Sequence, residues 1–119
     1  MTTDGKAAEI AANEWLIQQG RAPIGTNLWY PEGEIDWLGW DRNVLTIVEI
    51  KATSMDWEIA AQRIDRKKIE RLNRLANRLR IEHPEWNDNE LRLEALLVRR
   101  TNTKQPWNFH LLQIGNYDE

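Results

Sequence analysis

The chain has 119 residues, of which 41% are hydrophobic and 29% charged, a composition typical of one globular domain. It contains no cysteine, which excludes disulfides, thiolate nucleophiles and cysteine metal sites. No apolar run approaches the roughly 20 residues that cross a bilayer, and the N-terminus lacks the hydrophobic core of a signal peptide. We therefore predict a single domain over residues 1–119, with residues 1–4 frayed, no membrane partner and a cytoplasmic location.

The net charge of −3 conceals a strongly basic segment. Residues 63–80 hold eight lysines and arginines against two acids, which leaves 8 bases and 17 acids in the rest of the chain. Local fields, and not the total charge, decide where a polyanion docks. Nucleic acid is therefore a candidate partner of this acidic chain.

A helix is predicted from about residue 5 to Gln19, ended by Gly20. Its small side chains predict close packing against a sheet. Glu9 lies at the border of the apolar face, where its carboxylate either faces solvent or reaches around the edge of the sheet. The apolar face consists of Ala8, Ala11, Ala12 and Trp15.

Three strands in a meander are predicted over residues 24–30, 35–40 and 44–51, with turns at 31–33 and 41–43. Antiparallel pairing of the second and third strands brings Asp36 close to Glu49 and Lys51. Since side chains alternate between the faces of a strand, Glu49 and Lys51 point the same way. Leu45 and Ile47 share that face, as expected for a buried central strand.

Residues 54–62 are ambiguous, and a loop followed by a helical turn fits them. A long helix is predicted from the N-cap Asp65 to about Glu82, before His83-Pro84. Lys68 falls inside the apolar stripe of this helix, and we expect it to point toward Asp36 and Glu49, because a buried lysine needs an acidic partner. The stripe is Ile64, Ile69, Leu72, Leu75, Ala76 and Leu79, and the basic face beside it is Arg63, Lys67, Arg71, Arg74 and Arg78.

Two final strands are predicted over residues 91–98 and 107–114, with residues 99–106 as their connecting loop. The order α-β-β-β-α-β-β predicts an α/β fold with a mixed β-sheet flanked by helices.

Carboxylates gathered at the end of a buried strand indicate an oxygen-ligand site for Mg²⁺ or Mn²⁺. Asp36 and Glu49 are its core, with Glu9 as a helical contribution. Two alternatives stay open on the pattern alone. Charges two apart on a strand are commonly a solvated face or a cross-strand ion pair, and the acids could instead form an ion-pair network with Lys51 and Lys68.

The chain contains four short motifs: Gly5-x-x-x-Glu9, Gly33-Glu34-Ile35-Asp36, Val48-Glu49-Ile50-Lys51 and Lys68-x-x-Arg71-Leu72. Together they resemble the YraN family of small bacterial proteins, over residues 5 to about 98. That family is similar to archaeal Holliday-junction resolvases and belongs to the PD-(D/E)XK nuclease superfamily. The chain departs from the family at Ala52-Thr53-Ser54, where an arginine commonly follows the motif lysine.

The resemblance implies a restriction-endonuclease-like core and assigns roles to individual residues. The catalytic residues would be Glu9, Asp36, Glu49 and Lys51, with the metal held by Asp36, Glu49, the carbonyl of Ile50 and Glu9. Glu94 stands where the family usually has aspartate. The basic helix face would grip the nucleic-acid backbone without reading its sequence. Its contact residues would be Lys67, Lys68, Arg71, Arg74 and Arg78.

The resemblance favours a metal-dependent endonuclease that hydrolyses DNA phosphodiester bonds, with branched DNA such as Holliday junctions as a candidate substrate. A homodimer is a candidate assembly, since resolvase relatives act as dimers on the two symmetric cuts of a junction. The alternative is a non-catalytic nucleic-acid-binding module of the same fold. A third possibility is a protein-interaction scaffold that uses some of the seven tryptophans.

Overall fold

The computed structural model describes residues 3–100, 102 and 104–116. Residues 3 and 4 belong to the first helix, and residues 1 and 2 of the predicted frayed end lie outside the described residues. The elements are α1 (Thr3–Gln18), β1 (Ala22–Tyr30), β2 (Gly33–Asp41), β3 (Val44–Ala52), α2 (Trp57–Gln62), α3 (Arg66–Glu82), the 3₁₀ helix η1 (Pro84–Trp86), β4 (Leu91–Arg99) and β5 (Asn108–Asn116).

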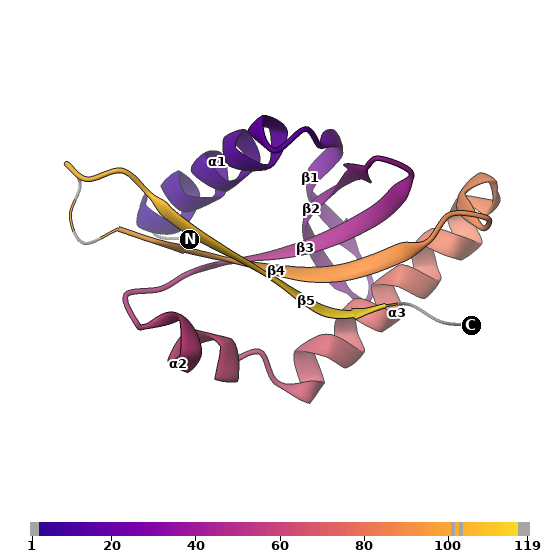
Figure 1. Cartoon of the computed structure of the whole chain (residues 1–119). Helices are drawn as coiled ribbons and strands as arrows, with labels where there is room; N and C mark the ends of the chain where they lie inside the picture. The colour runs from indigo at the N-terminus through magenta and orange to yellow at the C-terminus, as the bar shows by residue number, and fades with distance from the viewer. Residues whose placement is uncertain (1–2, 101, 103, 117–119) are drawn as a thin grey trace.

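The five strands form one mixed sheet in the order β1-β2-β3-β4-β5. β1, β2 and β3 are an antiparallel meander, β3 and β4 are parallel, and β5 returns antiparallel to β4. A parallel pair needs a long crossover, and the segment with α2 and α3 provides it. Helix α1 covers one face of the sheet, and α2 and α3 lie on the other (Figure 1). The predicted mixed sheet flanked by helices, a restriction-endonuclease-like α/β fold, is confirmed.

Helix α1 packs through its small side chains, as its sequence predicts. Ala8, Ala12 and Leu16 are fully buried against Trp37 of β2 and Val48 of β3. The helix ends before Gly20, whose φ of 90° lies in the left-handed region that glycine adopts without strain. The short side chains let the helix axis lie close to the sheet, which also brings the N-terminal half of α1 to the ends of the strands.

Helix α3 covers the opposite face with the predicted apolar stripe. Asp65 caps it, its Oδ1 accepting a hydrogen bond of 2.9 Å from the backbone N–H of Lys68. The buried residues of this helix are Leu72, Leu75, Ala76 and Leu79, which pack against Ile35, Leu38, Leu45 and Ile47 of the sheet. Because both faces of β3 are covered, its residues 45–48 are all buried, as predicted for a central strand.

Smaller elements refine the prediction. The ambiguous residues 54–62 end in the six-residue helix α2, and the turn between β2 and β3 is the two-residue pair Arg42-Asn43, with Arg42 at a φ of 60°. Strand β5 begins at Asn108, one residue later than predicted.

Among the described residues, the helices are too short or too polar for any of them to cross a membrane.

Candidate functional site

The site is built around a paired irregularity in strands β1 and β2. Strict alternation would place Ile35 and Trp37 on one face, yet Ile35 joins the core under α3 whereas Trp37 joins the core under α1. The change of face falls at Asp36. Asn27, which the register places opposite Asp36, has a φ of 51° and so makes the matching break in β1. The two irregular residues bring their polar side chains together at one point of the sheet.

Asp36 bridges to the next strand at the position where the β2–β3 ladder stops. The described pairing of these strands ends at Trp37 and Val48. Beyond it, Oδ2 of Asp36 accepts a hydrogen bond of 2.8 Å from the backbone N–H of Ile50. The carboxylate therefore takes the place of a ladder carbonyl and holds open the fork between β2 and β3. The prediction that Asp36 lies close to the 49–51 segment is confirmed.

The electrostatic environment of Asp36 disfavours its charge. Burial raises the pKa of this carboxyl to about 7, the Ile50 N–H opposes the shift, and the negative charges of Glu49, Glu34 and Glu9 add to it. Four carboxylates thus act on one small volume. A divalent cation is the type of group that would relieve this repulsion, as protonation of Asp36 would.

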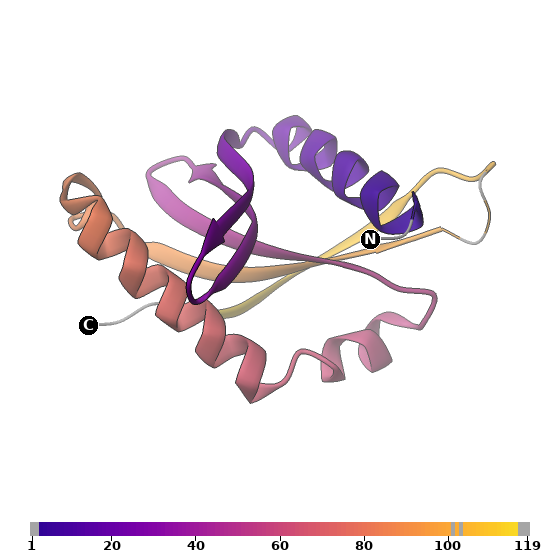
Figure 2. The same ribbon diagram turned by 180° about the vertical axis from the view of Figure 1, so that it is seen from behind.

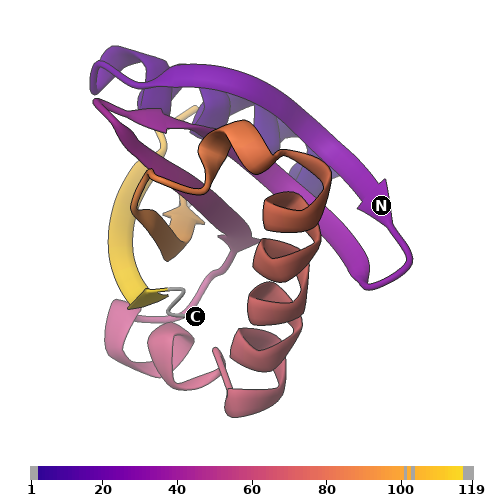
Figure 3. The same ribbon diagram turned by 90° about the vertical axis from the view of Figure 1, so that its right-hand side faces the viewer.

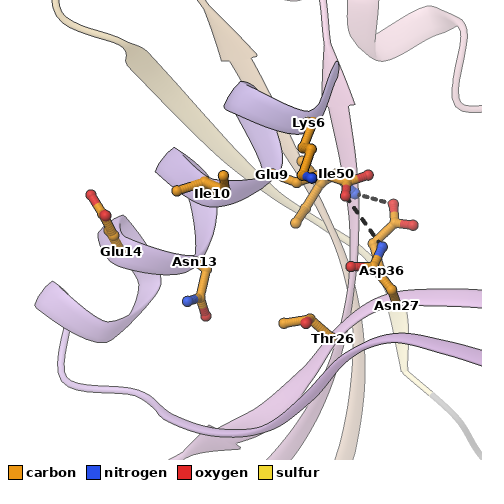
Figure 4. Close-up of a pocket in the computed structure, with 9 residues that line it drawn as sticks. All are labelled: Lys6, Glu9, Ile10, Asn13, Glu14, Thr26, Asn27, Asp36 and Ile50. Carbon is orange, nitrogen blue, oxygen red and sulfur yellow. Dashed lines mark hydrogen bonds between the residues drawn. The ribbon is translucent and has the colours of Figure 1, made fainter. Parts of the chain in front are cut away.

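The carboxylate of Glu9 extends from α1 toward Asn27 and Asp36. This is the second of the two predicted orientations, in which the side chain reaches around the edge of the sheet. The amide Nδ2 of Asn27 donates to Glu9 Oε1 at 3.2 Å and to Glu34 Oε2 at 3.0 Å. Glu9, Asn27, Asp36 and Ile50 gather at one end of an open pocket of about 200 Å³ between α1 and the strands, and Glu14 lies at the other end (Figure 4). The pocket therefore contains three of the four predicted metal-binding residues.

Sequence reasoning missed the structural role of Asn27 and Glu34. Asn27 is an asparagine inside a predicted strand, and asparagine is enriched at positive φ. The residue type therefore indicated a break in the strand at this position. Glu34 belongs to a quoted motif but was assigned no role. Together they fix the orientation of Glu9, because the amide of Asn27 joins the two carboxylates.

Glu49 faces α3 and not the pocket. Its Oε2 forms an ion pair with Nη2 of Arg71 at 2.8 Å. The Glu49 side chain is 15% exposed and the Arg71 side chain 27%. Lys68, which we predicted to approach the acids, makes no ion pair among the described residues, and Arg71 occupies that position. The basic helix therefore does supply a cation to the acidic cluster, one turn later than predicted.

The predicted metal-binding residues do not form a preassembled cage. Within the part of the chain that the structure describes, no three aspartate, glutamate or histidine side chains lie together as a ready metal site. The donors are nevertheless of the right chemistry, since Asp36, Glu9 and Glu49 offer hard carboxylate oxygens and Ile50 offers a carbonyl. Completing the set requires the Glu49 carboxylate, now paired with Arg71, to turn toward the pocket.

Lys51 lies two residues beyond Glu49, near the end of β3 where it pairs with Leu97 of β4. The unbroken β3–β4 register keeps Glu49 and Lys51 on one face, as predicted. The lysine is exposed, and its amine forms no ion pair with any described residue. It is therefore free to contact a ligand at this end of the sheet.

The basic face of α3 is only partly available. Lys67 and Arg74 are exposed, whereas Arg71 is paired with Glu49 and Arg78 binds Glu32 through two hydrogen bonds of 2.8 and 2.9 Å. Glu32 belongs to the β1–β2 turn, which lies beside α3 (Figures 2 and 3). The five predicted nucleic-acid contacts thus include two arginines that already form ion pairs, one with Glu49 of β3 and one with Glu32 of the turn.

Glu94 has a structural partner that the sequence did not indicate. Its carboxylate is 4% exposed and accepts hydrogen bonds of 2.6 and 3.1 Å from the buried guanidinium of Arg21. Asp41 and Arg92 complete this cluster of two acids and two arginines. Glu94 pairs with Val48 in the sheet, so it lies next to the strand that leads to Glu49.

Comparison with known proteins gives consistent relatives over most of the chain. A UPF0102 protein of Beutenbergia cavernae is 31% identical over 112 residues, which are 93% of this chain and 94% of that protein. A UPF0102 protein of Nitrobacter winogradskyi is 35% identical over 95 residues, 79% of each chain.

The matched region contains most of the site. The family model of the uncharacterised protein family UPF0102 matches residues 8–98, which run from the start of the α1 core through Glu9, Asp36, Glu49, Lys51 and α3 to the end of β4. This is the YraN family that the four motifs resemble. The chain therefore belongs to the protein family UPF0102.

Proposed function

We propose that this chain is a metal-dependent endonuclease that hydrolyses DNA phosphodiester bonds, with branched DNA such as a Holliday junction as the first substrate to test. The observation that carries the proposal is the Asp36 carboxyl. It is anchored on the Ile50 N–H, and burial first, then the charges of Glu49, Glu34 and Glu9, raise its pKa to about 7. Acids concentrated in this way suit a cation, and the basic helix α3 on the other face of the sheet suits a polyanion.

The residues would divide the chemistry among them. Asp36, Glu49, the carbonyl of Ile50 and Glu9 would hold Mg²⁺ or Mn²⁺, which supplies charge neutralisation and a lower pKa of the attacking water. Asn27 would orient Glu9 through the hydrogen bond already present. Lys51, exposed on the face of Glu49, would stabilise the negative charge that develops on the phosphate.

The helix α3 would position the DNA backbone. Lys67 and Arg74 are exposed and make no ion pair among the described residues, so their charges are available to phosphates. Such contacts fix the position of the nucleic acid without reading its sequence, which agrees with a substrate recognised by shape.

A second candidate is a nucleic-acid-binding module of the same fold without turnover. The ion pair between Glu49 and Arg71 favours it, because this pair satisfies one of the proposed metal ligands within the protein. On this alternative the acids and Arg71 stabilise the fork of the sheet, and the basic helix still binds DNA.

Cleavage of an end-labelled four-way junction in Mn²⁺ separates the two candidates. We expect the wild-type chain to cut, and Lys51→Ala and Asp36→Asn to lose at least about 100-fold in rate, the size of effect typical of a lost charge-stabilising group. Lys104→Ala is the matched control, an exposed lysine in the loop before β5, and should cut like the wild type. Junction binding without cleavage would favour the binding module, and equal cleavage by all variants would contradict the proposed site.

A further inference from the structure

Arg71 contacts both the candidate site and the backbone beside it. Its Nη2 pairs with Glu49 Oε2 at 2.8 Å, and its Nη1 donates to the backbone carbonyl of Glu34 at 3.4 Å. The pair is partly shielded from water, with side-chain exposures of 27% for Arg71 and 15% for Glu49. Arg71 thus has one partner in the backbone and one in a carboxylate that the proposed reaction needs.

The contact is permitted by a glycine at the start of β2. Gly33 has a φ of 142°, and a Cβ at this position would lie 3.1 Å from both Cδ and Nη1 of Arg71. The arginine therefore lies directly on the backbone of the β1–β2 turn. This close packing and the Glu34 carbonyl would keep the guanidinium near the site even if Glu49 turned away.

Arg71 holds Oε2 of Glu49 and so keeps this carboxylate on the α3 side, away from the pocket that Glu9 and Asp36 line. With Glu49 on Arg71, no three acidic or histidine side chains among the described residues are grouped as a metal site. When a cation takes Glu49, the positive charge of Arg71 loses its partner, at a partly buried position where an unpaired charge is unfavourable. A DNA phosphate is the anion that the proposed function brings to this place.

We propose that Arg71 is an exchangeable counterion: it holds Glu49 in the metal-free chain, yields Glu49 to a divalent cation, and then binds a phosphate of the DNA. This inference rests on the proposed function. Because binding energies are reciprocal, metal and DNA would each strengthen the binding of the other through Arg71. Arg71 is therefore a positioning residue for the metal site as well as a DNA contact.

The first test compares the Mn²⁺ affinity of wild type, Arg71→Gln and Arg78→Gln, measured from free Mn²⁺ by electron paramagnetic resonance. Arg78 is the matched control, since it lies on the same helix, pairs with Glu32 at 2.8 Å and is 31% exposed. We expect Arg71→Gln to bind Mn²⁺ about three- to tenfold more tightly, the range for a partly exposed ion pair, and Arg78→Gln to change it by less than about twofold.

The second test measures the gain in DNA affinity on adding Ca²⁺, with a labelled junction as the probe. Wild type should gain affinity, Arg78→Gln should bind more weakly but show the same gain, and Arg71→Gln should lose most of the gain. A purely structural role of Arg71 would weaken binding equally with and without Ca²⁺. Circular dichroism of each variant checks that the fold is intact.

The outcomes separate this inference from the proposed function. If wild type binds Mn²⁺ and Arg71→Gln binds it no more tightly than Arg78→Gln does, the exchange is wrong while the metal site stands. If neither wild type nor Arg71→Gln binds Mn²⁺, the proposed function fails and the exchange fails with it.

Discussion

At the scale of single residues, the site depends on one carboxyl in an unfavourable electrostatic position. Asp36 is held by the Ile50 N–H, and its pKa is raised first by burial and then by the negative charges of Glu49, Glu34 and Glu9. A structural aspartate would be expected to pair with a cation and have a lowered pKa, as Asp41 does beside Arg92. The ionised Asp36 carboxylate instead destabilises the folded chain, and a bound cation would remove this destabilisation.

This destabilisation predicts how the free energy of unfolding depends on pH. The pKa of Asp36 rises from 3.8 to about 7 on folding, so the folded state holds the proton more tightly than the unfolded state between these values. The free energy of unfolding therefore falls as pH rises through this window, and the loss is complete above about pH 7. Asp36→Asn keeps an oxygen acceptor for the Ile50 N–H, but its side chain does not ionise.

We expect Asp36→Asn to be more stable than wild type at pH 8 by about 1 to 2 kcal/mol, after allowance for solvent screening, and the difference to shrink toward pH 4. Urea unfolding at several pH values, without divalent cations, measures it. A variant that is less stable than wild type at pH 8 would show that Asp36 has a favourable ionic partner.

Arg21 illustrates the opposite case of a buried charge with a full partner. Arg21→Ala leaves the 4%-exposed Glu94 facing the remaining arginine, Arg92, at 3.4 Å. We expect a loss of about 2 to 4 kcal/mol, below the cost of a wholly isolated buried charge because Arg92 stays close.

The control for this prediction is Arg78→Ala, which breaks the more exposed pair with Glu32 and should cost clearly less than Arg21→Ala. Denaturant melts of both variants give the comparison. Similar losses for the two would mean that burial of the Arg21 pair adds nothing to stability.

At the scale of elements, hydrophobic periodicity predicted most of the fold. Four of the five predicted strands, at 24–30, 35–40, 44–51 and 91–98, lie inside observed strands, and α3 has its predicted cap at Asp65. These features depend on patterns within one segment, which the sequence displays directly. Antiparallel pairing then brought Asp36 to the 49–51 segment, as predicted.

What the sequence did not reveal depends on contacts between segments. The change of face at Asp36 requires the matching break at Asn27 in a different strand. The choice of Arg71 over Lys68 as partner of Glu49 depends on how α3 is rotated and shifted along the sheet. The ion pair of Arg21 with Glu94 joins residues 73 positions apart. None of these leaves a periodic signal in the chain.

The packing of α3 against the sheet gives an element-scale prediction. Leu75 is fully buried in the core beneath α3, so Leu75→Ala should lower the free energy of unfolding by about 2 to 5 kcal/mol. Ile81 is on the same helix but 68% exposed, and Ile81→Ala should stay within about 0.5 kcal/mol of wild type. Thermal or denaturant unfolding tests both, and equal losses would contradict the orientation of the helix.

At the scale of the whole molecule, acidic and basic surfaces meet at the β1–β2 hairpin. The pocket with Glu9 and Asp36 lies on the α1 side, whereas the basic face of α3 lies on the other side of the sheet. Glu34 joins the two, since its carboxylate binds Asn27 and its backbone carbonyl binds Arg71. On the proposed function, a cation and a nucleic-acid backbone would therefore bind at adjoining positions of this small acidic protein.

The most direct measurement of the central claim is Mn²⁺ binding to wild type, Asp36→Asn and Glu49→Gln, with Glu58→Gln as an exposed acidic control on α2. The account predicts that wild type and Glu58→Gln bind one Mn²⁺ alike, and that losing either proposed ligand weakens binding at least about tenfold. Equal affinities in all four chains, or no binding by wild type, would contradict it.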